Sequence, residues 1–116
     1  MNRLALALAL FVLPVPAAAQ YVQPVPWAAQ QPSMRDYRET YPPGALAEGV
    51  EGRVELLCTI TDEYKLDCAV RSETPAGYDF GAAALRLSQL YIASPEDPRI
   101  SVGGRVIVPI RYEIHE

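Results

Sequence analysis

Two cysteines and one histidine are the residues of this sequence best suited to redox or metal chemistry. Cys58 and Cys68 lie ten positions apart, and His115 is the next-to-last residue. Structural zinc sites take four ligands, so these three residues are too few, and a lone terminal histidine is more often a solvated tail residue. We therefore expect no metal site. In an oxidising compartment, the expected state of the cysteine pair is a disulfide.

Other residue patterns that would support catalysis are missing. With a single histidine there is no candidate general base beside a serine, and the sequence contains no G-x-S-x-G, no phosphate-binding glycine loop and no H-E-x-x-H. Acidic pairs occur at Asp62-Glu63 and Glu96-Asp97, where the composition predicts turns, so they are best interpreted as solvated loop charges. We expect no enzyme, no catalytic residue and no cofactor.

Length and charge restrict the remaining possibilities. A chain of 116 residues fits one domain. Acidic residues outnumber basic ones 14 to 10, which gives a net charge of −4. A nucleic-acid-binding protein would normally carry a basic surface, so nucleic acid is not an expected partner.

The first 19 residues have the layout of a secretory signal peptide. Arg3 precedes an apolar run over residues 4–13, and three alanines at 17–19 precede Gln20. The alternative is an uncleaved anchor in the inner membrane, but ten apolar residues are far fewer than the roughly 20 needed to cross a bilayer. We predict cleavage before Gln20 and export to the periplasm.

Residues 20–40 read as a proline-containing lead-in to a domain at 41–116. The first part, 20–33, carries three prolines, no charge and no helical or strand period, which predicts an exposed segment with polyproline character. Trp27, the only tryptophan, lies within it. We expect this side chain to pack back on the domain rather than to serve as an exposed recognition residue.

The domain begins with a short helix and a hairpin. Pro42 and Pro43 suit the first turn of a helix and Gly49 suits its end, which predicts a helix over 43–48. Apolar and polar residues then alternate over 54–61 and again over 65–71, as in two strands with one buried face. If Thr61 pairs with Lys65 across a three-residue turn, paired numbers sum to 126, which places Cys58 opposite Cys68.

A second helix and a third strand complete the pattern. Asp79 is the predicted N-cap of a helix whose apolar stripe contains Phe80, Ala83, Ala84, Leu87, Leu90 and Tyr91. A loop over 95–104 leads to a strand over 105–114. Pro109 cannot donate to a ladder, so this strand should lie at a sheet edge. We predict an α+β fold: a three-stranded antiparallel sheet with two helices on one face, in the order helix, strand, strand, helix, strand.

Several short motifs resemble the TonB C-terminal domain family. The run from Tyr41-Pro42-Pro43-Gly44-Ala45 through Gly49 and Gly52 to Val54 is similar to its Y-P-x-x-A-x-x-x-G-x-x-G-x-V opening, residues 80–85 to its L-D-x-A-A-L helix, and residues 108–112 to its closing v-P-i-x-F strand. Pro95 matches the proline after the helix. The resemblance covers about 41–114, and the paired cysteines look like those of small exported members.

This resemblance implies a function. It suggests energy transduction to outer-membrane siderophore or cobalamin receptors, whose TonB box would add as a strand to the last strand of the domain. The implied partner-binding residues are Arg105, Ile107, Pro109 and Arg111. Contact with the ExbB/ExbD motor is doubtful without an anchor. The alternative is a soluble periplasmic module that uses the same edge to bind another protein or a second copy, without transmitting force.

Overall fold

The strands of this protein form one three-stranded and one two-stranded antiparallel sheet in a computed structural model, which describes residues 24–114. The predicted signal peptide over 1–19, its cleavage before Gln20, and His115 lie outside the described residues. The elements are β1 (Ala28–Gln30), α1 (Met34–Thr40), α2 (Pro43–Ala47), β2 (Gly52–Ile60), β3 (Leu66–Thr74), α3 (Phe80–Ser88), β4 (Ile92–Ala93) and β5 (Arg105–Tyr112).

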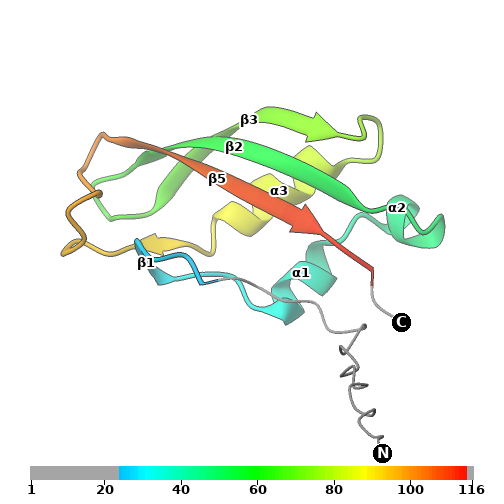
Figure 1. The fold of residues 1–116 in the computed structure, drawn as a ribbon, viewed down its shortest axis with the longest axis horizontal. Coiled ribbons are helices and arrows are strands. Elements are labelled where there is room, and N and C mark those ends of the chain that lie inside the picture. The colour runs from blue at the N-terminus through cyan, green and yellow to red at the C-terminus, as the bar shows by residue number, and fades with distance from the viewer. Residues whose placement is uncertain (1–23, 115–116) are drawn as a thin grey trace, which may run out of the picture.

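The larger sheet has the order β3-β2-β5, with all neighbours antiparallel (Figure 1). The predicted three-stranded antiparallel sheet is therefore confirmed, with β5 at one edge as Pro109 required. The smaller sheet pairs β1 with β4 and was not predicted. Its strands have three and two residues, too few to produce an alternating pattern.

β2 forms the centre of the fold because its side chains alternate strictly between the two faces. Val54, Leu56, Cys58 and Ile60 are at most 2% exposed, whereas Arg53 and the other odd-numbered residues point to the opposite face. A strand buried on one face and solvated on the other has a strongly specified register, since a slip of one residue would exchange the faces.

The hairpin register follows the sequence prediction from its turn as far as Leu56. The N–H of Thr61 donates to the carbonyl of Lys65 at 2.9 Å, and Cys58 lies opposite Cys68, to which it is joined by a disulfide. The register then shifts: Leu56 pairs with Val70 but Glu55 with Ser72, which leaves Arg71 as an extra residue in β3. Such a bulge bends its strand and disrupts the ladder locally.

Helix α3 lies against β3 and β2 on one face of the sheet (Figure 1). It begins at Phe80 as predicted but ends at Ser88, before Leu90, which is 37% exposed. Asp79 holds the N-cap position, yet its side chain makes no capping hydrogen bond because its backbone is left-handed, with φ 69°. The predicted position is right, and the predicted capping interaction is wrong.

The arrangement of the other helices corrects the expectation of two helices on one face. The predicted helix over 43–48 is present as α2, but this single turn lies at the end of the sheet, just before β2 (Figure 1). The helix that packs beside α3 is α1, from the segment expected to be a lead-in. Ser33 and Asp36 form a capping box at its start, and Tyr37 is its buried residue.

The described part of the lead-in, residues 24–40, thus folds with the domain instead of extending from it. Trp27 packs back as expected: its ring stacks on Tyr91 with centroids 6.0 Å apart, and its carbonyl accepts the N–H of Ser94 at 2.8 Å. No helix within residues 24–114 is long and apolar enough to cross a membrane. The disulfide indicates an oxidising compartment.

Replacing both cysteines by alanine is expected to lower the free energy of unfolding by about 2 to 3 kcal/mol. The disulfide closes a loop with a sequence separation of only 10, which restricts the unfolded chain by that order of magnitude. Urea denaturation of the wild-type protein, with and without a reducing agent, and of the double variant measures the effect. Equal stability of the oxidised and reduced protein would contradict it.

Gly52→Ala is expected to destabilise the domain by about 1 to 3 kcal/mol, because a Cβ there would collide with the ring of Phe80, which is fully buried. Gly44→Ala is the matched control: it lies in α2 with open space around the added Cβ, so it should be neutral or slightly stabilising. Thermal denaturation of both variants tests this pair, and a similar loss in each would show that the Phe80 contact is unimportant.

Candidate functional site

The outer edge of β5 carries main-chain groups that point away from the sheet. Ile60 directs both of its main-chain groups to the β5 side: its N–H donates to the carbonyl of Gly104 and its carbonyl accepts from Gly103, both at 2.8 Å. Antiparallel pairs alternate along a ladder, so even-numbered residues of β5 bond to β2 and odd-numbered residues face outward. Within residues 24–114, no strand pairs with this outer edge.

The four residues implied by the family resemblance all lie on this edge. Arg105, Ile107 and Arg111 each offer an outward N–H and carbonyl, and Pro109 offers a carbonyl alone. Because the odd-numbered position of Pro109 faces outward, its missing N–H costs the β2 ladder nothing. The proline therefore fits an edge strand without weakening the sheet.

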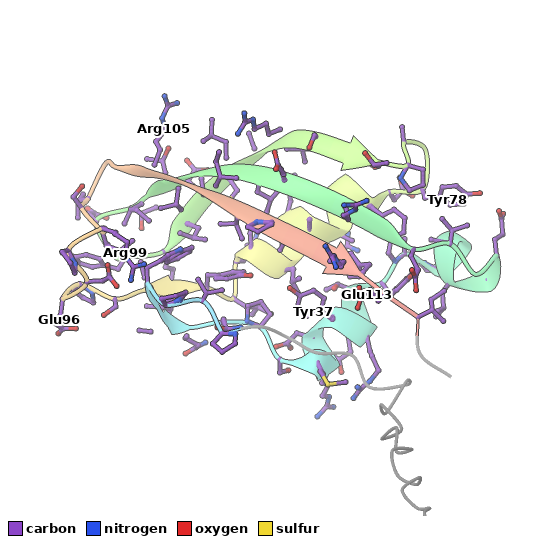
Figure 2. All side chains as sticks on the ribbon, in the orientation of Figure 1. Tyr37, Tyr78, Glu96, Arg99, Arg105 and Glu113 are labelled. Atoms are coloured by element: carbon purple, nitrogen blue, oxygen red, sulfur yellow. A yellow bond between two sulfur atoms is a disulfide. The ribbon has the colours of Figure 1, made fainter. Side chains whose placement is uncertain are left out.

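The side chains of these residues project to the face of the sheet that is turned away from α3. Ile107 is 45% exposed and lies opposite Leu57, while Arg105 lies opposite Thr59. Figure 2 shows Arg105 extending away from the start of β5, and Glu113 just beyond its end. An exposed aliphatic side chain is thus flanked by arginines along one rim.

A groove of about 750 Å³ lies along β5 on the side of the N-terminal segment, residues 24–31. Figure 1 shows this segment running beside β5. One wall is formed by residues 24–27 and Gln31, and the other by residues 107–111. The remaining lining residues are Tyr37, Arg53, Val54, Glu55, Tyr91 and Glu113. The sequence predicted that Trp27 would pack on the domain, but not that it would form a wall opposite β5.

The tyrosines of the groove and the core beneath it are uncharged at neutral pH. Burial raises the pKa of Tyr37 and of Tyr91, whose hydroxyls bond to each other. Burial also raises the pKa of Tyr112 to about 12, and its hydroxyl lies 2.7 Å from Oγ1 of Thr40. The groove therefore presents rings and aliphatic side chains between its walls, and its charged lining residues are Arg53, Glu55, Arg111 and Glu113.

A second hollow, of about 440 Å³, lies where β2 begins and where β3 and β5 end. Its lining residues are Glu51, Gly52, Arg53, Thr74, Pro75, Arg111, Tyr112 and Glu113. Arg53 and Arg111 line both hollows and lie directly opposite each other in the sheet. The alternation of β2 places Arg53 on the same face as Arg111, although none of the sequence motifs includes it.

The arginines of the sheet gather on one face although the chain as a whole is acidic. Arg53, Arg105 and Arg111 are odd-numbered residues of β2 and β5, and Arg71 reaches Glu55 on this face at 3.9 Å. Among all the residues that the structure describes, no group of three histidine, cysteine, aspartate or glutamate side chains could hold a metal ion. The arrangement suits recognition of an acidic, extended ligand.

Neither a scan against protein-family models nor a search of curated proteins finds a match for this chain. The described residues form an α+β domain in which the outer edge of β5 is open and lies beside a groove. The TonB resemblance rests on the sequence motifs alone.

Stability is expected to fall between pH 10 and pH 12. The pKa of Tyr112 is about 12 in the folded state, whereas an ordinary tyrosine side chain has a pKa of 10.0. The stability that this difference contributes is therefore complete below pH 10 and is lost as the pH rises to about 12. Urea denaturation at several alkaline pH values measures the fall. Tyr112→Phe, which cannot ionise there, should make it shallower, and an unchanged pH dependence would contradict this.

Proposed function

We propose that this protein is a periplasmic interaction domain that binds an extended segment of a partner protein by adding it as a strand to β5. The observation that carries this proposal is the outward row of main-chain groups on β5 beside a groove that residues 107–111 of this strand line. Main-chain hydrogen bonds would supply affinity, and alternate side chains would supply specificity.

The opposite edge of the sheet is less suited to this role. β3 contains the bulge at Arg71, which interrupts the regular spacing of its main-chain groups. Helix α3 also lies close to this strand: a Cβ at Gly81 would come within 3.2 Å of the Val70 side chain. β5 pairs with β2 without a register shift, which favours β5 as the site of strand addition.

The partner is proposed to be a TonB-dependent receptor of the outer membrane, with its TonB box as the added strand. Support comes from the motif resemblance over 41–114 and from the arginines Arg105 and Arg111 on either side of Ile107. The periplasmic location is proposed from the signal-peptide pattern of residues 1–19 and agrees with the disulfide.

Whether the protein transmits force depends on its N-terminus. An energy transducer needs an anchor to the inner membrane, and the apolar run at 4–13 has ten residues, against the roughly 20 that cross a bilayer. A second candidate is therefore a soluble periplasmic module that binds the same kind of segment without ExbB/ExbD. The mass of the protein in a periplasmic fraction distinguishes the two: a chain beginning at Gln20 favours the module, and a full-length chain confined to membranes favours the transducer.

Ile107→Pro is expected to weaken binding of a receptor TonB-box peptide at least tenfold without unfolding the domain. The N–H of residue 107 faces outward, so proline removes a donor from the ligand's ladder and none from β2. Fluorescence of Trp27, the only tryptophan, measures binding because its side chain lines the groove.

Ile107→Thr is the matched control, since it shortens the same side chain but keeps the N–H. It should bind the peptide within about threefold of wild type, because only part of a half-exposed aliphatic contact is lost. Equal binding by the proline variant and the wild type would rule out strand addition at this position, and absence of binding to the wild type at millimolar peptide would rule out the proposed function.

A further inference from the structure

Two arginines face each other across the β2 and β5 strands at the end of the groove. Arg53 and Arg111 are directly opposed, in a position where β2 and β5 do not exchange hydrogen bonds. Opposed side chains in such pairs are close, with Cβ atoms about 4.5 to 5.5 Å apart, and like charges there are destabilising. The folded protein therefore holds two positive charges together on the face of the sheet that is turned away from α3, the open face.

Three glutamates line the same two hollows as these arginines, and one of the three forms an ion pair with Arg111. Glu113 reaches Arg111 at 3.5 Å, but Glu51 accepts the N–H of Ile114 at 2.9 Å and Glu55 is paired with Arg71. Within residues 24–114, Arg53 has no carboxylate within 4.0 Å. Arg53 therefore makes no ion pair within the described residues, and the five donors of its guanidinium suit a carboxylate.

The location of the pair connects it to the edge that receives the partner segment. Both arginines line the groove of about 750 Å³ and also the hollow of about 440 Å³ at the end of the sheet. A segment added to β5 would have one residue opposite Arg111, with its side chain on the same face as the two guanidinium groups. Neighbouring strands are about 4.8 Å apart, so this residue would lie about 9.6 Å from β2, a gap that extended arginine and glutamate side chains span together.

We propose that Arg53 and Arg111 bind one carboxylate side chain of the added segment, at the residue that pairs with Arg111. This inference rests on the proposed function and specifies its ligand. The added segment carries an acidic residue on the open face. The residues directly before and after it are apolar, because their side chains point to the other face of the sheet, toward Trp27 and Tyr91. The arginine pair therefore selects both the composition of the ligand and its register along β5.

The test uses the whole mature protein and a nine-residue peptide, acetylated and amidated, with the sequence TVTVEVTVT. Its valines share one face, its glutamate is central, and the sequence reads the same in both directions, so strand polarity does not affect the comparison. A second peptide has glutamine in place of glutamate. The glutamate peptide should bind about fivefold tighter, as expected for a partly exposed ion pair, and the preference should shrink in high salt.

Variants then assign the preference to the pair. Arg53→Gln should reduce the preference for the glutamate peptide to nearly one, and Arg53→Lys should keep part of it because the charge remains without the planar fork. Arg86→Gln is the matched control, because this exposed arginine lies on α3, on the other side of the sheet. It removes the same charge and should leave the preference unchanged.

The free protein supplies an independent measurement. If Arg53 is held beside Arg111 for binding, Arg53→Gln should leave the midpoint of thermal unfolding unchanged or raise it, since it relieves a like-charge contact. A clear fall in that midpoint would show a structural role and overturn the proposal, as would equal affinity of wild type for the two peptides. If neither peptide binds at millimolar concentration, the proposed strand addition itself fails.

Discussion

The hydrogen-bonded alternation of β2 is the constraint on which the rest of the structure depends. Because Val54, Leu56, Cys58 and Ile60 all face the core, the same register closes the disulfide with β3 and fixes which residues of β5 point outward. A slip of one residue would bury Arg53 and Glu55 without partners and separate the cysteines. The free edge of β5 is thus a consequence of how the central strand is buried, not a separate feature of the last strand.

The parts of the fold that could be predicted are those in which neighbouring residues in sequence decide the geometry. The three-residue turn between Thr61 and Lys65 sets the register of the hairpin, so the opposition of Cys58 and Cys68 follows from counting. Pro109 locates the edge strand because a missing N–H is tolerated there and not at the centre of a sheet. The bulge at Arg71 could not be predicted in this way, since nothing in the local pattern distinguishes an extra residue from a regular one.

The parts that could not be predicted depend on contacts between distant segments. Helix α1 has one buried residue, Tyr37, and so lacks an apolar stripe, although Ser33 and Asp36 carry the spacing of a capping box. The wall of the groove exists because Trp27 stacks on Tyr91, 64 positions further along the chain. The sequence therefore indicated the rim of the candidate site on β5, whereas the groove that gives this rim a second side became visible only in the folded chain.

The same geometry argues that β5 is better suited to a foreign segment than to a second copy of itself. In a two-fold antiparallel pairing centred on Val108, each Arg105 would lie opposite the other copy's Arg111, and each Pro109 would leave one carbonyl of Ile107 without a donor. A pairing centred on Pro109 would place two prolines opposite each other, and neither could donate a main-chain hydrogen bond to the other. A partner with acidic side chains avoids the opposition of arginines. With its own N–H opposite Pro109, only one main-chain carbonyl of the partner lacks a donor, instead of one carbonyl in each strand. The charges and the proline that protect this edge from self-association are therefore the features that favour an acidic, extended partner.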